Sequence, residues 1–228
     1  MDKFEGFPAA GFEWFRKLAN NNNRPWFEKH KQDYLDNLQA PALAMVVELG
    51  ERLKSIIPGI SYGARPNGGS LMRIYRDIRF SKDKTPYKTH IGINWWEGVG
   101  EGGSGFHFFM DAEGAVLYAG HHNFDKPYLA AFRDAVADDR TGRALQQAID
   151  KLTKVGDYEA GGEQLKRVPP GYEQDHPRGD LLRYKGLWVR SPKMKPAVLG
   201  SPKLIDTCLK HCRAMLPVHK WFAAVVQA

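Results

Sequence analysis

The first quarter of the chain, residues 8–57, carries apolar residues at the spacing of amphipathic helices. Apolar side chains recur every three positions from Phe12 to Leu18, and a run of asparagines then interrupts the pattern. Pro25 and Pro41 each stand where proline is favoured, in the first turn of a helix. We therefore expect three helices here, the second and third beginning at these prolines.

From Leu71 onward, apolar and polar residues alternate with the two-residue period of half-buried strands. The alternation predicts strands at 71–80, 89–97, 104–111 and 115–121. Between the last two, the sequence Asp-Ala-Glu-Gly at 111–114 is typical of a hairpin turn. Because consecutive strands are joined by short connections, the sheet should be antiparallel.

The remaining half of the chain returns mainly to helical spacing. Asp125 is suited to cap a helix, and a second helical pattern follows around 145–152. Glycine and proline are frequent from 156 to 202, where only a short helix and a short strand are expected, and 202–227 is helical with a division at Pro217. The fold class predicted is α+β: one domain, 1–228, whose antiparallel sheet is flanked by N-terminal and C-terminal helices.

Composition narrows the class of protein. Hydrophobic residues make up 43% and charged residues 26% of the 228 positions, which is near the globular average. No apolar run approaches the roughly 20 residues of a membrane span, and the beginning lacks the pattern of a signal peptide. The two cysteines, Cys208 and Cys212, have a helical spacing that does not suit a disulfide. We expect a cytoplasmic protein with no membrane partner.

Most of the excess positive charge lies in one segment, 73–90. It contains six Lys or Arg and two Asp, so 6 − 2 = +4 of the formal +7 charge is found there. If the segment is a strand, Met72, Ile74, Ile78 and Phe80 share its buried face and Arg76 falls on that face as well. A buried, unpaired guanidinium is costly, so Arg76 needs a carboxylate, a bound anion or a bulge.

This segment is the predicted site for a phosphate- or carboxylate-bearing ligand, because guanidinium and ammonium groups bind both. The predicted ligand-binding residues are Arg73, Arg76, Arg79, Lys82, Lys84 and Lys88. If a reaction occurs there, the acid or base candidates are Asp77, Asp83 and His90. An alternative interpretation is an internally paired charge ladder with no ligand.

The same segment carries a resemblance to a known family. The run from Arg73 to His90 reads RIYRDIRFSKDKTPYKTH, and further matches are NNNRPWF at 21–27, KRVPPGY at 166–172 and DHP at 175–177. Together they resemble a family of uncharacterised microbial and fungal proteins, the domain of unknown function 2461 family. The resemblance implies a compact domain but no assigned activity, cofactor or catalytic residue. The sequence departs from the family pattern at 121–123.

A second group of candidate residues lies in the glycine- and proline-rich region. It consists of Lys166, Arg167, Asp175, His176 and Lys185, with Arg178 and Arg183 nearby. An aspartate beside a histidine can form part of an acid–base pair, and the cations can bind an anion. An Asp-His-Pro turn that caps a short helix near Leu181 explains the same residues.

Other motifs in the sequence are weaker evidence of function. The glycines at 98–103 match G-x-G-x-x-G, but a strand rather than a helix is predicted to follow, so a dinucleotide loop is disfavoured. Cys208, His211, Cys212 and His219 are better explained as core residues of a helix than as metal ligands. The aromatic residues Trp95, Trp96, Phe106, Phe108 and Phe109 could stack on bases, although strand aromatics usually pack in the core.

The sequence thus predicts a protein that binds an anionic small molecule at the 73–90 segment, with no cofactor and no metal. The alternatives are a nucleic-acid-binding domain that uses the basic segment and nearby aromatics, and a non-catalytic structural or interaction domain. If the protein is an enzyme, a hydrolase or transferase acting on an anionic substrate is expected. The oligomeric state stays open.

Overall fold

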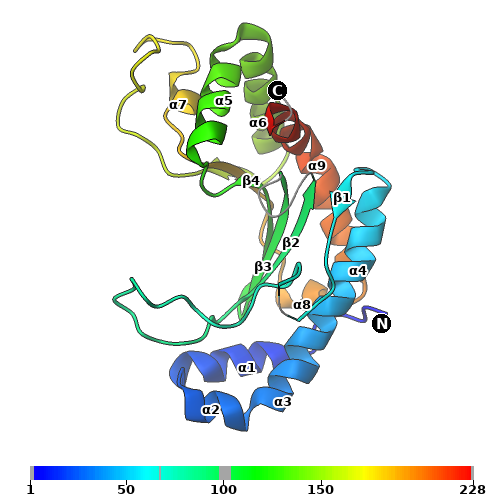
Figure 1. Cartoon of the computed structure of the whole chain (residues 1–228). Helices are drawn as coiled ribbons and strands as arrows, with labels where there is room; N and C mark the ends of the chain where they lie inside the picture. Colours follow the sequence, from blue (N-terminus) through cyan, green and yellow to red (C-terminus); the bar gives the residue numbers. More distant parts are fainter. Residues whose placement is uncertain (1–2, 67, 98–103, 227–228) are drawn as a thin grey trace. The chain divides into compact units, whose positions relative to one another are not determined.

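A computed structural model describes residues 3–66, 68–97 and 104–226 of the chain (Figure 1). Helices and an antiparallel six-stranded sheet with the order β1-β2-β3-β4-β6-β5 confirm the predicted α+β class. The strands are β1 (Ile60–Ser61), β2 (Ile91–Glu97), β3 (Gly105–Asp111), β4 (Gly114–His121), β5 (Glu159–Gly161) and β6 (Leu187–Arg190). The last two pair antiparallel, with Ala160 opposite Val189.

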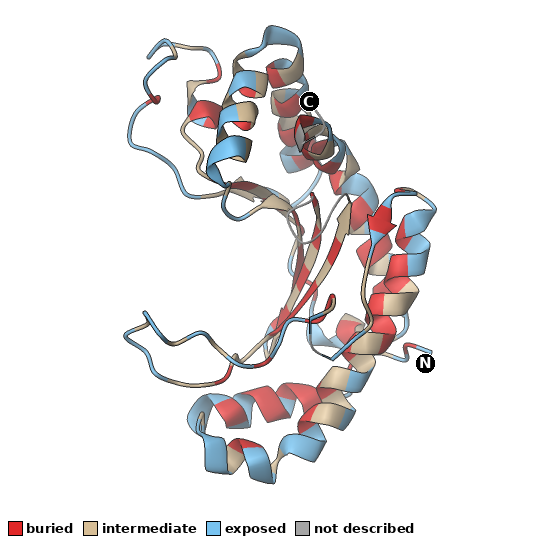
Figure 2. Cartoon of the chain, viewed as in Figure 1, coloured by how far each residue is buried: buried red, intermediate tan, exposed pale blue. Residues whose placement is uncertain are grey.

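Three of the four predicted strands are present, because their alternation has a core to face. Buried and intermediate positions alternate along the whole of β3 (Figure 2). The turn between β3 and β4 also forms as predicted, and the Asp111 carboxylate accepts the Glu113 N–H at 2.8 Å. The predicted strand at 71–80 is wrong. That segment contains only isolated bridges, at Leu71 and Tyr75, within the described residues.

Helices form in the predicted regions of the chain, but the predicted division at Pro217 is absent. The helices are α1 (Ala9–Asn20), α2 (Arg24–Lys29), α3 (Lys31–Tyr34), η1 (Leu35–Gln39), α4 (Ala40–Lys54), α5 (Lys126–Ala137), α6 (Asp139–Lys154), α7 (Gly179–Leu182), α8 (Pro196–Leu199) and α9 (Lys203–Val226). Pro41 stands in the first turn of α4, as predicted. The π-helical turn η1 leads directly into α4. Pro217, in contrast, lies inside one continuous helix, α9, so the predicted division there is wrong.

The chain divides into two compact units, which are described separately. The first comprises Met1–Trp95, His107–Leu117 and Lys193–Lys210. In this unit the Trp95 indole donates to the Val46 carbonyl of α4 at 3.0 Å, so α4 packs on β2. Phe7 stacks on Phe108 of β3 with ring centroids 6.3 Å apart. These contacts give the first unit an aromatic core.

The second unit comprises Trp96–Phe106, Tyr118–Pro192 and His211–Ala228. Its core is built from α5 and the end of α9, where Phe132 stacks on Phe222 and the Tyr128 hydroxyl donates to the Phe222 carbonyl at 3.1 Å. Asp125 caps α5 by accepting the Tyr128 N–H at 2.8 Å, as predicted. The structure therefore supplies each unit with its own buried cluster.

Candidate functional site

The basic segment forms an irregular loop, which we call the basic loop (residues 73–88). Its two limbs pair near their base, where the Lys88 N–H donates to the Ile74 carbonyl at 2.8 Å and the Arg76 N–H donates to the Pro86 carbonyl at 2.9 Å. Beyond that point, no strand in the described part of the chain pairs with either limb. The predicted buried face is therefore missing: Ile74 is buried, but Met72 is 40% exposed and Phe80 is 93% exposed.

The base of the basic loop is held by residues of the asparagine-rich turn. The Asn22 side chain donates to the Tyr87 carbonyl at 2.9 Å and accepts the Tyr87 N–H at 3.0 Å, as a neighbouring strand would. The Phe27 ring stacks on Tyr87 with centroids 4.1 Å apart, and Tyr75 packs against the same ring at 5.4 Å. Two of the sequence runs that carry the family resemblance thus contact each other.

Arg76 lies in an ion pair rather than on a buried face. Its guanidinium donates to the Asp83 carboxylate at 2.5 Å, to the Thr85 carbonyl at 3.1 Å and to the Thr85 hydroxyl. The Thr85 N–H and then Arg76 stabilise the ionised carboxylate, so the pKa of Asp83 is lowered. The prediction that Arg76 needs a partner is met within the loop, and Asp83 is held ionised.

Arg79 forms the second internal pair of the loop. Its Nε donates to Asp77 Oδ1 at 3.0 Å and its Nη2 donates to Oδ2 at 2.7 Å, the bidentate arrangement. The Arg79 side chain, followed by its backbone N–H, lowers the pKa of the Asp77 carboxyl. Lys84 donates to the Ile78 carbonyl at 3.0 Å. Half of the predicted ligand-binding cations are therefore engaged within the loop.

Arg73, Lys82 and Lys88 are the other half. Among the described residues, their side chains make no hydrogen bond and no ion pair. Lys88 is half-buried, and its pKa is lowered first because burial removes water from the ammonium and then because the Arg73 guanidinium repels it. Arg73 and Lys88 thus lie near enough to repel each other, and the Asp77 carboxylate, which Arg73 also stabilises, is already paired with Arg79.

His90 lies beside this pair. Its ring packs on Phe109 with centroids 4.6 Å apart. Burial, followed by the charge of Lys88, lowers the pKa of His90, while Asp111 acts in the opposite direction. The imidazole is therefore neutral at pH 7 and retains one nitrogen that can accept a proton. We call Arg73, Lys88 and His90 the loop-base site.

The second group of candidate residues surrounds a hollow of about 380 Å³ in the second unit. Lys166, Arg167, Asp175 and His176 line it together with Arg183, whereas Lys185 instead forms an ion pair with Glu163. The turn predicted before Leu181 is present. It is His176, however, that makes the turn's side-chain bond, accepting the Arg178 N–H at 3.0 Å.

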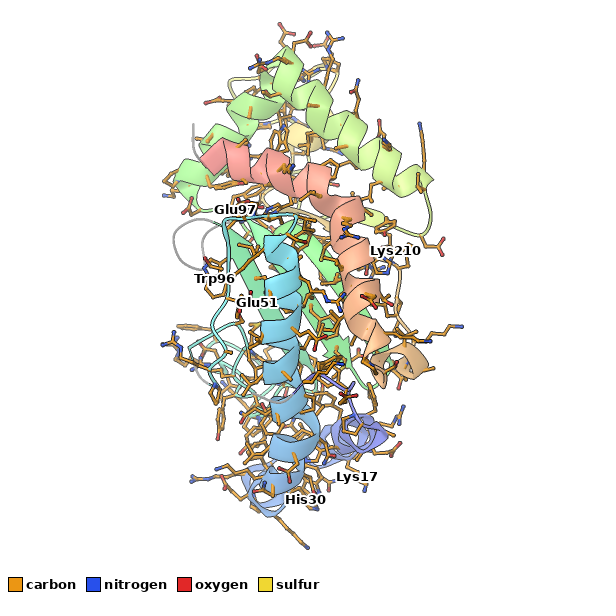
Figure 3. The ribbon with its side chains drawn as sticks, turned by 90° about the vertical axis from the view of Figure 1, so that its right-hand side faces the viewer. Lys17, His30, Glu51, Trp96, Glu97 and Lys210 are labelled. Atoms are coloured by element: carbon orange, nitrogen blue, oxygen red, sulfur yellow. The ribbon has the colours of Figure 1, made fainter. Side chains whose placement is uncertain are left out.

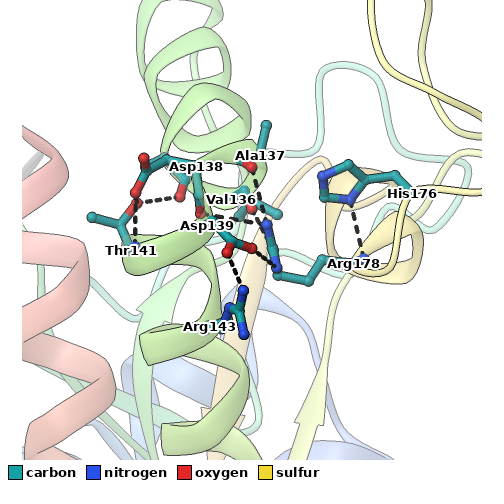
Figure 4. A network of polar contacts seen from close by, with 9 residues as sticks. Val136, Ala137, Asp138, Asp139, Thr141, Arg143, His176 and Arg178 are labelled. Carbon is teal, nitrogen blue, oxygen red and sulfur yellow. Dashed lines mark hydrogen bonds and ion pairs between the residues drawn. The ribbon is translucent and has the colours of Figure 1, made fainter.

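Arg178, which sequence reasoning grouped with the anion-binding cations, is a scaffold residue (Figure 4). It is only 7% exposed. Its guanidinium donates to the Val136 carbonyl at 2.8 Å and to the Ala137 carbonyl at 3.0 Å, and it pairs with Asp139 at 3.2 Å. These bonds satisfy the carbonyls at the end of α5. A β-carbon at Gly142 would lie 2.0 Å from the Val136 carbonyl oxygen and 2.5 Å from the Arg178 Nε, so the contact between these two groups needs a glycine there.

The two cysteines and His219 of α9 belong to the core, whereas His211 is half-buried and bonds to the Tyr158 hydroxyl at 2.7 Å. Cys208 and Cys212 are buried, and the His219 ring lies between Ser104 at 3.0 Å and the Glu97 carboxylate at 2.9 Å. Glu97 is labelled next to Trp96 in Figure 3. Over the ranges that the structure describes, no group of three or more His, Cys, Asp or Glu residues is placed to hold a metal ion.

The aromatic residues predicted as a possible base-stacking surface are mostly buried. Trp95, Phe106 and Phe108 are each at most 1% exposed, which confirms core packing for these three. Their rings are therefore closed to a nucleic acid. The glycine motif at 98–103 lies outside the described residues. No helix in the described part of the chain has the length and apolarity needed to span a membrane.

Comparison with known proteins agrees with the resemblance read from the motifs. No curated protein and no solved structure matches the chain. The family model described as conserved hypothetical protein (DUF2461) matches residues 10–221, a range that includes both the basic loop and the hollow. The chain therefore belongs to the DUF2461 family.

Proposed function

We propose that the protein binds a small molecule bearing a phosphate or carboxylate group at the loop-base site. The observation that carries the proposal is the pair of cations Arg73 and Lys88, which repel each other and form no ion pair among the described residues. A bound anion between them would replace this repulsion with two charge-assisted hydrogen bonds.

The internal pairs of the basic loop support this role. Arg76 with Asp83 and Arg79 with Asp77 neutralise each other, so they fix the course of the loop and leave its net positive charge to the remaining cations. The anchor of Tyr87 on Asn22 sets the position of Lys88, the next residue. A ligand would thus meet cations whose backbone is already held in place, which lowers the entropic cost of binding.

If the site also catalyses a reaction, His90 is the residue we assign to proton transfer. Asp77 and Asp83 are held ionised by their arginine partners, which lower the pKa of each carboxyl. A neutral imidazole can accept a proton near pH 7. Turnover in a phosphatase or esterase panel that His90→Gln removes, while folding is retained, would place the protein among the hydrolases.

Thermal unfolding in the presence of sulfate or phosphate tests the binding proposal. At ten times its Kd, an anion stabilises the folded protein by about 1.4 kcal/mol, which raises the Tm by roughly 3–5 °C for a chain of this size. We expect Arg73→Ala/Lys88→Ala to lose most of this rise and to keep only the part that comes from weaker anion binding elsewhere in the chain. Lys82→Ala removes an exposed cation of the same loop and should keep the full rise. An equal rise in all three proteins would contradict the proposal.

A further inference from the structure

The walls of the hollow in the second unit are held by hydrogen bonds that do not involve the charged groups of the cations lining it. The Tyr172 hydroxyl donates to the Asp134 carboxylate of α5 at 2.8 Å, and the Gln174 amide donates to the Val168 carbonyl at 2.9 Å. The Leu165 N–H donates to the Arg183 carbonyl at 2.8 Å. These bonds fix the segment 165–183 from both sides.

Arg178 and His176 add a hydrogen-bond donor of defined direction. The buried Arg178 is held by α5 and α6, and its backbone N–H donates to the Nδ1 of His176 at 3.0 Å (Figure 4). Because Nδ1 accepts this bond, the proton of the neutral imidazole must lie on Nε2. His176 lines the hollow, and we assign its Nε2–H as a donor to the ligand.

The charges that line the hollow do not cancel. Arg183 pairs with Asp180 at 2.9 Å. Lys166 and Arg167 are exposed and form no ion pair within the described ranges, and only Asp175 remains to oppose them. Two free cations and a histidine N–H match a phosphate group, which carries up to two negative charges. Asp175 can accept a hydrogen bond from a hydroxyl group on the rest of the ligand.

The volume limits the size of that ligand. About 380 Å³ lies near the lower end of the range for small-molecule sites, which is roughly 300–1,000 Å³. It accommodates a phosphate with one sugar-sized polar group but is small for a dinucleotide. We propose that the hollow binds a small phosphate monoester of a polyhydroxylated molecule, through Lys166, Arg167 and His176. This inference is independent of the loop-base site.

Isothermal titration calorimetry with glucose 6-phosphate as the probe tests the proposal. The parent for this experiment is Arg73→Ala/Lys88→Ala, in which the loop-base site is removed. We expect the parent to bind glucose 6-phosphate, to bind inorganic phosphate more weakly, and not to bind glucose. Lys166→Ala/Arg167→Ala should weaken binding of glucose 6-phosphate at least tenfold, since two charged hydrogen bonds are lost. His176→Gln should weaken it severalfold.

The matched control is Lys151→Ala/Lys154→Ala, which removes two exposed lysines from α6 and should leave the affinity unchanged. Circular dichroism confirms that each variant is folded. The proposal is overturned if the parent does not bind glucose 6-phosphate, or if the Lys166/Arg167 variant binds it as the parent does. Equal affinities for inorganic phosphate and glucose 6-phosphate would overturn the assignment of a monoester.

Discussion

The basic loop and the segment 165–183 that lines the hollow use arginine in opposite ways. In the basic loop, Arg76 and Arg79 pair with carboxylates of the same loop and lie at the surface. In the other segment, Arg178 is buried and bonds to carbonyls of α5. The local density of arginine therefore does not identify a binding site. What matters is which cations keep no partner after the chain has folded.

The largest loss of folding stability is expected when the buried Arg178 is replaced. Arg178→Ala removes the partner of two carbonyls and leaves Asp139 with Arg143 alone. Because Asp139 is exposed, the main cost comes from the two carbonyls that lose their donor, about 1–3 kcal/mol each. Urea unfolding should show a decrease of this order in the free energy of unfolding. Arg143→Ala, which removes the exposed partner of the same aspartate, should change the midpoint little; equal losses in the two variants would show that Arg178 is not a scaffold.

A smaller loss of folding stability is expected when the base of the basic loop loses its hydrogen bonds to Asn22. Asn22→Ala removes both bonds to the Tyr87 backbone. Leaving a part-buried donor and acceptor unsatisfied costs about 2 kcal/mol. The same variant should lose the sulfate-induced rise in Tm, since Lys88 follows Tyr87. Asn20→Ala, in an exposed position of the same asparagine run, serves as the control and should behave as the unmodified chain does.

The pH dependence of the loop-base site gives a finer test. The pKa of His90 is lowered by burial and by Lys88, so the unfolded chain binds a proton at a higher pH than the folded one. This histidine therefore costs stability as the pH falls below about 6.5, its unfolded value. An NMR titration should show the pKa of His90 rising in sulfate and in Lys88→Ala. A pKa that responds to neither would separate His90 from the site.

The smallest effect is expected at the exposed pair of the basic loop. Arg79→Ala breaks the bidentate contact with Asp77, but both side chains face water, where ion pairs contribute little. Chemical unfolding should give a midpoint close to that of the unmodified protein, and the sulfate response should persist. A loss of that response on this single change would move the binding site from the base of the loop to Arg79.

The sequence predicts the fold class and three strands because their alternation faces a real core, as in β3. It fails at 71–80 because alternation alone does not show whether a neighbouring strand exists. Phe80 completes the predicted apolar face and yet is almost fully exposed. Pro41 marks the start of α4 correctly, whereas Pro217 misleads, since the helix α9 continues through it.

The candidate sites could be predicted only in part. The sequence identifies the basic segment but cannot tell paired cations from free ones, because the pairing depends on how the loop folds. Arg73 and Lys88 become neighbours only when Tyr75 and Tyr87 pair across the loop. Arg178 gives no local signal of its role, since its partners lie about 40 residues earlier in the chain.

We propose that Arg73 and Lys88, rather than Arg76 and Arg79, are the cations that hold an anion. A crystal of the protein soaked in selenate tests it most directly, because selenate mimics sulfate and its selenium gives an anomalous X-ray signal. We predict an anomalous peak within hydrogen-bonding distance of both the Arg73 guanidinium and the Lys88 ammonium. A peak at Arg76 or Arg79 with none between Arg73 and Lys88 would contradict the claim.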